Sequence, residues 1–319
     1  MSTTPQQVRT TDYHTAGEPF RIVDEDLPPL PGDTVAARRA LAPRLGPVDE
    51  LRRLLVREPR GHSGMYGGFV VPPDDDGAHF GVLFWHKDGY STACGHGTMA
   101  LGAWAVDTGR VPAPDDGDVP VRVDVPSGRV TATVHRAGGR TTGVTFRNVP
   151  ARVLARKVPV TTASGTVDVD LADSGACYVS VPARALGLDT TPASLPALVR
   201  AGREIRAAFP RHDVYGVILH EELPDTPTGP RQRNVTVFAD GQVDRSPCGS
   251  GTSARLVLLG DEGRLAPGDV LTHESVAGTV FTGRLLSGGI TEVTGATHRT
   301  GTHTFVLDPH DDLGTGFLL

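Results

Sequence analysis

The sequence predicts an α+β protein built from two pseudo-equivalent lobes. Short strand-like segments alternate with short helix-like segments along all 319 residues, and one seven-residue motif occurs twice, about half a chain apart. A chain of this length is long enough for about two domains. With 38% hydrophobic and 21% charged residues, it can build a core and keep a polar surface.

The strand-like segments are short runs rich in Val, Phe and Thr that end at Gly, Pro or Asp. They are Phe69–Val71, Phe80–Trp85, Val121–Val125, Val130–Val134, Val144–Phe146, Ala176–Val181, Val214–Leu219 and Asn234–Phe238. The helix-like segments are Thr34–Leu45, Pro47–Val56, Thr98–Thr108, Pro192–Phe209 and Thr252–Leu259. Leu223–Arg233 is rich in proline and poor in apolar residues, so we expect an exposed connection there.

Charge and hydropathy exclude several classes of protein. The net charge of −6 gives no basic footprint for nucleic acid. No apolar run approaches the roughly 18 residues of a membrane helix, and Met1–Tyr13 lacks the hydrophobic region of a secretory signal. We therefore expect a cytoplasmic protein whose partner is neither nucleic acid nor a membrane.

The chain has three cysteines, Cys94, Cys177 and Cys248. An odd number, without a signal sequence, argues against a disulfide framework. Cys177 lies in an apolar segment, so we expect it to be buried packing. The histidines show no zinc-site spacing, and we expect no metal site.

The repeated motif is Cys94–Ala100, which returns as Cys248–Ala254 with five of seven positions identical. Each copy follows a strand-like segment and an Asp-Gly turn, and each precedes a helix-like segment. The repeat therefore predicts that each lobe presents a cysteine at the N-terminus of a helix.

A cysteine in this position suits acid–base chemistry. The helix dipole and free N–H groups favour the thiolate and should lower the thiol pKa from about 8.5 toward neutrality. The glycines uncover backbone amides that can bind an anion such as a carboxylate. If two such sites face each other, one thiolate can remove an α-proton while the opposite thiol delivers a proton to the other face.

Gly95-x-Gly97-x-x-Ala100 and its counterpart Gly249-x-Gly251-x-x-Ala254 also fit a dinucleotide fingerprint. That pattern is weak without its βαβ unit and an acidic residue about 20 positions later. The Gly-Lys-Ser/Thr ending of a phosphate loop is absent from the sequence. A carboxylate is therefore the favoured anion.

Several longer blocks carry a family resemblance. They are His14–Arg21, Glu58–His62 with Met65–Gly67, Cys94–Thr98, and Asp240–Thr252. The chain resembles the proline racemase family from end to end; this family includes proline racemase, 4-hydroxyproline epimerase and trans-3-hydroxy-L-proline dehydratase. More distantly it is similar to the diaminopimelate epimerase architecture. The resemblance implies two pseudo-symmetric lobes, each a curled β-sheet around a central helix, with no cofactor, a small amino-acid substrate and a possible homodimer.

The resemblance also implies lobe boundaries and site residues. The first lobe would comprise residues 1–153 with about 303–319, and the second residues 154–302. Cys94 and Cys248 would be the two acid/base thiols, and Asp244 would contact the substrate amine. The residues implied to bind the substrate carboxylate are Gly95, His96, Gly249, Ser250 and Thr252.

Two activities remain open at this point. In the dehydratase branch the second cysteine is typically threonine, so Cys248 favours a racemase or epimerase of proline or a hydroxyproline, an isomerase. Phe84–Thr92 and Arg60–His62 are closer to the dehydratase branch, which makes a lyase with Cys94 as base the alternative. We give the second cysteine more weight, because inversion needs an acid on the far face and elimination does not.

Asp173–Cys177 departs from the family pattern Tyr-Gly-Gly-x-Phe. A two-lobed binding protein with incidental cysteines is the non-enzymatic alternative.

Overall fold

The computed structural model describes residues 7–210 and 213–319. Residues 1–6 of Met1–Tyr13, the segment predicted to lack a secretory signal, lie outside the described part. The chain divides into two compact units. Unit 1 contains the residues up to Val144 and Thr297–Leu319, and unit 2 contains Thr145–Ala296. Among the described residues, no helix is both long and apolar enough to cross a membrane.

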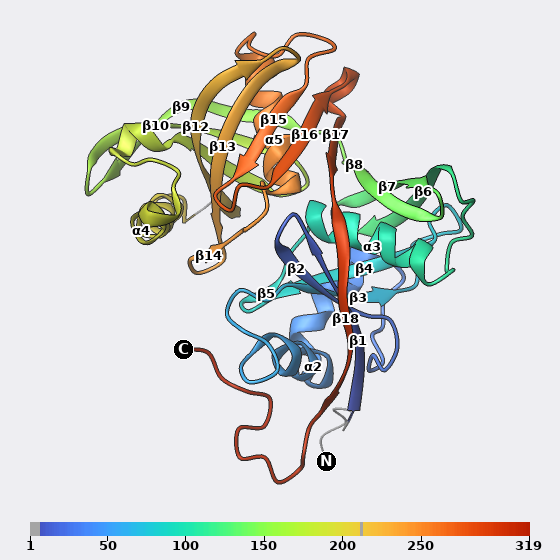
Figure 1. Cartoon of the computed structure of the whole chain (residues 1–319). Helices are drawn as coiled ribbons and strands as arrows, with labels where there is room; N and C mark the ends of the chain where they lie inside the picture. The colour runs from blue at the N-terminus through green and yellow to red at the C-terminus, as the bar shows by residue number, and fades with distance from the viewer. Residues whose placement is uncertain (1–6, 211–212) are drawn as a thin grey trace. The chain divides into compact units, whose positions relative to one another are not determined.

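Unit 1 is a sheet that packs around helix α3 (Gly95–Asp107) (Figure 1). Every residue of this helix up to Val106 is buried. Strands on several sides of the helix contact it, including β1, β7 and β18. The strands are β1 (Gln7–Thr15), β2 (Glu18–Val23), β3 (Gly67–Val71), β4 (Phe80–His86), β5 (Gly89–Tyr90), β6 (Gly117–Val125), β7 (Gly128–Ala137) and β18 (Thr297–Val306). Strand β8 (Arg140–Arg147) crosses from unit 1 into unit 2.

Unit 2 repeats this arrangement around helix α5 (Gly249–Asp261), which is buried from Gly249 to Leu259. Strands β9, β10 and β16 contact α5, as β18, β1 and β7 contact α3. The strands are β9 (Arg152–Thr162), β10 (Gly165–Asp173), β11 (Cys177–Pro182), β12 (Val214–Thr226), β13 (Gly229–Phe238), β14 (Gln242–Val243), β15 (Leu271–Ser275), β16 (Val280–Leu285) and β17 (Thr291–Gly295). The predicted α+β fold of two pseudo-symmetric lobes is confirmed.

The pairing of strands is the same in both units. In unit 1, β18, β1 and β2 are antiparallel neighbours, β2 runs parallel to β3, β3 antiparallel to β4, and β4 parallel to β6. Strands β9, β10, β11, β12, β13 and β15 have the same relations in unit 2. A short hairpin strand, β5 or β14, precedes each central helix. Neighbouring strands pair Arg21 with Gly67 and Gly67 with Trp85 in unit 1. In unit 2 they pair Val179 with Val217 and Val217 with Val237. These two rows of residues occupy equivalent positions.

Successive residues of a strand point to opposite faces of the sheet, so each sheet has a face toward its central helix and an outer face. Other helices cover the outer faces. In unit 1, Leu51 and Leu55 of α2 (Gly46–Val56) belong to one apolar cluster with Phe69 and Leu83, next to α1 (Val35–Leu41). In unit 2, Leu198 and Ile205 of α4 (Leu195–Ala207) do the same with the outward residues of β12 and β13. The alternate residues of these strands face the central helix.

Two expectations are corrected by the structure. Leu223–Arg233 is not a connection but most of a hairpin, in which β12 ends at Thr226 and β13 begins at Gly229. The pairing register shifts between Leu223 and Thr226, which accommodates Pro224, and Arg233 forms an ion pair with Glu274 of β15 at 2.8 Å. Cys177, which we expected to be buried, is only half-buried. It begins β11 and packs against the core, and burial raises the pKa of its thiol to about 11.

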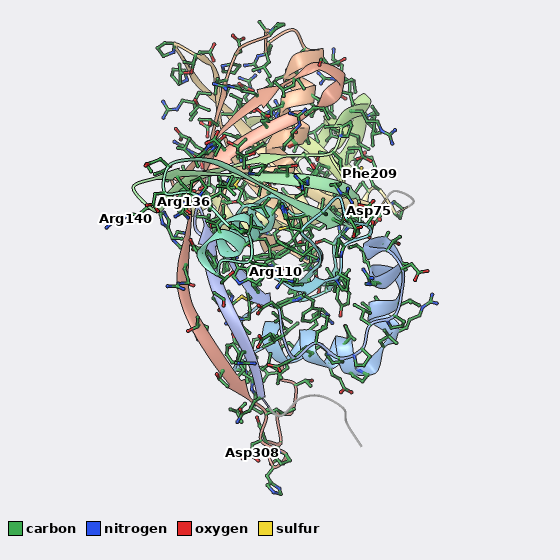
Figure 2. All side chains as sticks on the ribbon, turned by 90° about the vertical axis from the view of Figure 1, so that its right-hand side faces the viewer. Asp75, Arg110, Arg136, Arg140, Phe209 and Asp308 are labelled. Carbon is green, nitrogen blue, oxygen red and sulfur yellow. The ribbon has the colours of Figure 1, made fainter. Side chains whose placement is uncertain are left out.

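The C-terminal segment beyond β18 returns to the end of α2. Asp308 lies on this segment (Figure 2). Arg60 forms an ion pair with Asp311 at 2.8 Å, and the backbones of Glu58 and Phe317 exchange hydrogen bonds of 3.1 and 3.0 Å. These contacts fix the segment against unit 1.

Candidate active site

Each central helix begins directly after a cysteine, as the repeat predicts. Cys94 is the N-cap of α3, and its Sγ accepts a hydrogen bond from the Gly97 amide at 3.3 Å. Cys248 is the N-cap of α5, and its Sγ accepts one from the Gly251 amide, also at 3.3 Å. A Cβ atom on Gly97 or Gly251 would lie 2.9 or 3.0 Å from the sulfur. The glycine therefore allows each sulfur to reach the helix amide.

The surroundings of Cys94 are aromatic. The Nδ1 atom of His96 lies 3.4 Å from its Sγ, and both residues are buried. The rings of Phe20 and Tyr66 meet the His96 ring edge-on, with centroids 5.8 and 5.0 Å away. Thr15 at the end of β1 donates a hydrogen bond to the His96 carbonyl at 2.9 Å. The imidazole is therefore held beside the thiol by contacts on several sides.

The surroundings of Cys248 are more polar. The Tyr178 hydroxyl lies 3.8 Å from its Sγ, and the Cys248 amide donates to Ser246 Oγ at 3.1 Å. Asp244 Oδ1 accepts from the Ser246 amide at 2.9 Å and from the Ser246 hydroxyl at 2.7 Å. The chain Asp244–Ser246–Cys248 thus fixes the turn that leads into α5. Its backbone at Cys248 has φ +66°, a value that L-residues rarely adopt.

The expectation of a lowered thiol pKa is wrong for Cys248. Burial and the Asp244 carboxylate raise the pKa of this thiol well above its usual value. The hydrogen bonds from Gly251 and Tyr178 act in the opposite direction but are smaller effects. Cys248 therefore keeps its proton at neutral pH, which suits a proton donor.

The residues predicted to bind the substrate carboxylate lie in the first turns of these two helices. Gly95 and His96 are the first two residues of α3, and Gly249 and Ser250 are the first two of α5. Ser250 is 1% exposed, and its hydroxyl has no hydrogen-bond partner among the described residues. A buried hydroxyl without a partner is unfavourable, so Ser250 is suited to receive a polar ligand.

Thr252 has protein partners for its hydroxyl. His273 Nδ1 lies 2.8 Å away, and the hydroxyl donates to the Pro247 carbonyl at 3.3 Å. These bonds shape the turn before Cys248, and the substrate contact of Thr252 stays a prediction. Sequence reasoning did not identify Tyr178, Ser246 or His273. The serine between Asp244 and Cys248 was a visible signal, whereas Tyr178 and His273 come from distant strands.

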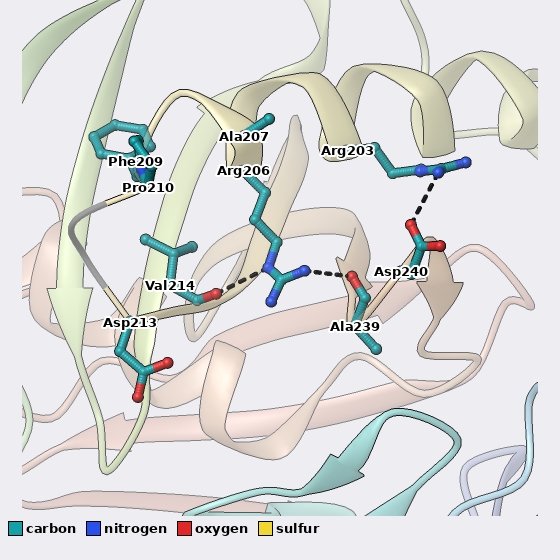
Figure 3. Close-up of a pocket in the computed structure, with 9 residues that line it drawn as sticks. All are labelled: Arg203, Arg206, Ala207, Phe209, Pro210, Asp213, Val214, Ala239 and Asp240. Atoms are coloured by element: carbon teal, nitrogen blue, oxygen red, sulfur yellow. Dashed lines mark hydrogen bonds and ion pairs between the residues drawn. The ribbon is translucent and has the colours of Figure 1, made fainter.

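A surface pocket of about 420 Å³ lies beside α4 (Figure 3). Arg206 donates there to the carbonyls of Val214 and Ala239 at 2.9 and 2.7 Å, and Arg203 pairs with Asp240 at 2.9 Å. The residues that line it include neither helix-capping cysteine. Arg206 therefore anchors the turn between β13 and β14. Among the described residues, no group of three or more His, Cys, Asp or Glu side chains could hold a metal ion.

The sequence matches one protein family along most of its length. Residues 10–318 match the proline racemase family. The chain is 41% identical over 336 residues to the 3-hydroxyproline 2-epimerase of Burkholderia multivorans, covering 98% of each chain. It is 42% identical to the human trans-3-hydroxy-L-proline dehydratase, covering 97% of this chain and 93% of the relative.

Solved structures show the same fold. A hydroxyproline epimerase from Agrobacterium vitis, with bound trans-4-hydroxy-L-proline, superimposes with a TM-score of 0.89 at 28% identity, covering 100% of this chain and 97% of that one. A predicted epimerase from Pseudomonas aeruginosa shares the fold at 15% identity, with a TM-score of 0.63 and coverage of 94% and 100%. The match along nearly the whole sequence and the similarity to the relatives above show that the chain belongs to the proline racemase family.

Proposed function

We propose that this chain is a cofactor-independent racemase or epimerase of proline or a hydroxyproline, with Cys94 and Cys248 as its two acid/base groups. The observation that carries the proposal is the duplicated helix start. Each of two equivalent helices is capped by a cysteine whose sulfur reaches the amide of the third helical residue. Inversion at one carbon needs one such group for each face of the substrate.

The thiols differ in the way that a two-base reaction requires. Cys248 is held protonated by burial and by Asp244, so it is suited to donate a proton. Cys94 has an imidazole nitrogen 3.4 Å from its sulfur and is suited to act as the base. The proposed step moves the α-proton to the Cys94 sulfur while the Cys248 thiol protonates the opposite face of the same carbon. The reverse direction uses the same groups with their roles exchanged.

The substrate carboxylate would bind at the helix starts. Backbone amides there carry the positive end of each helix dipole, and the Ser250 hydroxyl is buried and ready to donate. These donors would stabilise the negative charge that moves onto the carboxylate when the α-proton leaves. Asp244 would contact the substrate amine, which is cationic.

The names of the relatives favour a 3-hydroxyproline. The epimerase of B. multivorans is 41% identical, whereas the A. vitis epimerase with bound 4-hydroxyproline is 28% identical. The second candidate is a trans-3-hydroxy-L-proline dehydratase, because relatives of that name are 38–42% identical. Elimination of water would use Cys94 as base and would not need Cys248 as a proton donor.

The test is a substrate panel in deuterated water. Trans-3-hydroxy-L-proline, trans-4-hydroxy-L-proline and L-proline are incubated with the protein, and α-deuterium is followed by proton NMR together with optical rotation. We expect deuterium at the α-carbon with inversion, and a loss of at least about 10²-fold in Cys94→Ser and in Cys248→Ser. Cys177→Ser is the matched control and should keep full activity.

Two results would overturn the proposal. A cyclic imine product, detected with o-aminobenzaldehyde and still formed by Cys248→Ser, would identify a dehydratase. Neither deuterium exchange nor inversion nor imine on any of these substrates would reject both activities.

A further inference from the structure

Two pairs of equivalent positions differ between the helix starts. The second residue of the central helix is His96 in α3 and Ser250 in α5. Phe20 in β2 and Tyr178 in β11 are the second pair. They are equivalent because they directly precede Arg21 and Val179, which occupy equivalent positions in the two sheets. The aromatic ring is common to this second pair, and the hydroxyl is present only on Tyr178.

In unit 1, the residue on the helix reaches the thiol. A nitrogen of His96 lies 3.4 Å from Cys94 Sγ. Phe20 touches the same region, since a Cβ atom on Gly97 would lie 2.4 Å from its ring, but Phe20 has no hydrogen to donate. The helix therefore supplies a polar side-chain contact to this thiol.

In unit 2, the polar contact comes from the strand. The Tyr178 hydroxyl lies 3.8 Å from Cys248 Sγ, whereas the hydroxyl of Ser250 has no partner among the described residues. Tyr178 is 1% exposed, and Tyr215 packs edge-on against its ring with centroids 5.7 Å apart. Tyr215 in turn stacks on Phe238. These contacts fix the direction in which the phenol points.

We propose that Tyr178 is a positioning residue for Cys248. From its strand it supplies to the second thiol the hydrogen bond that His96 supplies to the first thiol from the helix. The part of this inference that concerns catalysis rests on the proposed function. When Cys248 releases its proton, a thiolate forms near the Asp244 carboxylate, and the two negative charges repel each other. The phenol donates its hydrogen to the thiolate sulfur and keeps its own O–H bond, so no proton is transferred from Tyr178. This hydrogen bond favours the charged form of the sulfur.

The experiment measures each thiol separately in the full-length protein. Iodoacetamide alkylation is followed across pH by mass spectrometry of the peptides that contain Cys94, Cys177 and Cys248. In Tyr178→Phe we expect the midpoint of the Cys248 profile to move to higher pH, with alkylation about three- to tenfold slower at a fixed pH below it. The Cys94 profile should stay in place. Tyr215→Phe removes the same atom from the adjacent ring and should leave both profiles unchanged.

Turnover provides the second readout. On the substrate panel above, Tyr178→Phe should lower kcat about three- to tenfold and leave KM within about twofold, because the phenol acts on a proton transfer and not on binding. Thermal unfolding of each variant checks the fold. If Tyr178→Phe does not fold, Tyr178→Met is used in its place, because it fills much of the same volume without a hydroxyl.

The outcomes separate this inference from the proposed function. A shifted Cys248 profile in a protein that turns over none of the substrates supports the role of Tyr178 and rejects the proposed activity. A Cys248 profile that is identical in Tyr178→Phe and in the wild type overturns the inference, whatever the activity. A shift of equal size in Tyr215→Phe also overturns it, because the effect would then be one of packing.

Discussion

The two units share one topology but surround their central helices with different chemistry. Five buried positions are apolar in unit 1 and polar at the equivalent places in unit 2. The pairs, with the unit 1 residue named first, are Phe80 and Gln232, Val82 and Asn234, Phe84 and Thr236, Leu101 and Arg255, and Val123 and His273. A fold can therefore hold a capped helix with either kind of core, and the polar core calls for a separate explanation.

Part of that polar core supports the turn before Cys248. Asn234 donates to His273 Nε2 at 2.9 Å and to the Pro247 carbonyl at 3.0 Å, and its own oxygen accepts from Thr236 at 3.0 Å. Since His273 Nε2 accepts, Nδ1 carries the proton and donates to Thr252, which donates to Pro247. The peptide bond before Cys248 is thus held from two sides.

The backbone explains why support is needed in one unit only. Cys248 has φ +66°, a conformation that costs a residue with a side chain about 1–3 kcal/mol. Cys94 has φ −158°, which is ordinary extended backbone. The buried network therefore offsets local strain at the second thiol, whereas the backbone at the first thiol carries no such strain.

A charge placed in the apolar core gives the largest expected effect. Leu101→Arg would bury an unpaired guanidinium in unit 1 and should cost several kcal/mol or prevent folding. The reverse change, Arg255→Leu, removes hydrogen bonds to Gln232 at 3.1 Å and Ser180 at 3.0 Å and should cost only about 1–3 kcal/mol. Urea unfolding of both variants measures the difference. Equal losses would show that the two cores are interchangeable.

Acid should weaken the polar core of unit 2 through its two buried histidines. Burial lowers the pKa of His273 to about 3 and that of His220 well below its ordinary value. Both stay neutral in the folded state, whereas the unfolded chain takes up protons below about pH 6.5. Their contribution to stability is therefore present above that pH and is lost as the pH falls, by about 2 kcal/mol at pH 5 for His273.

Hydrogen exchange at pH 7.5 and pH 5.0 checks this prediction. After correction for intrinsic exchange rates, peptides from β13, β15 and α5 should lose more protection than those from β6 and β7 of unit 1, strands without a buried histidine. Equal losses in both sets of peptides would contradict the assignment of acid sensitivity to His220 and His273.

A matched pair of threonines gives a smaller effect. Thr252→Val removes the partner of His273 Nδ1 and a bond to Pro247, and it should destabilise the protein by about 1–3 kcal/mol. Thr98→Val at the equivalent position removes only a 2.7 Å bond to the Cys94 carbonyl and should cost about 1 kcal/mol or less. Thermal and urea unfolding compare them. A larger loss in Thr98→Val would mean that the strained turn does not depend on its network.

Local patterns in the sequence predicted the helices and both cysteine caps. Helix α2 was predicted to within one residue of its observed start, and the repeated glycine motif correctly indicated two equivalent helices. The strands missed in the sequence carry few consecutive apolar residues. In β18 most residues are exposed, and the strand exists because it pairs with β1 at the other end of the chain.

Long-range contacts also explain what was missed in the site. Tyr178 reaches Cys248 across 70 residues of sequence, and His273 reaches Thr252 from the following strand. The predicted direction of the thiol pKa failed at Cys248 because a helix dipole is visible in a motif, whereas burial is not. Asp244 was identified through the family resemblance, but its effect on the thiol depends on the turn that only the fold defines.

The central claim is that both thiols act on one carbon atom, and a crystal structure with pyrrole-2-carboxylate tests it most directly. This planar ring acid resembles the flattened carbanion that forms when the substrate loses its α-proton. We expect one bound molecule, with the sulfurs of Cys94 and Cys248 on opposite faces of the ring carbon that carries the carboxylate. Sulfurs in separate cavities, or on the same face of the ring, would contradict a two-thiol inversion.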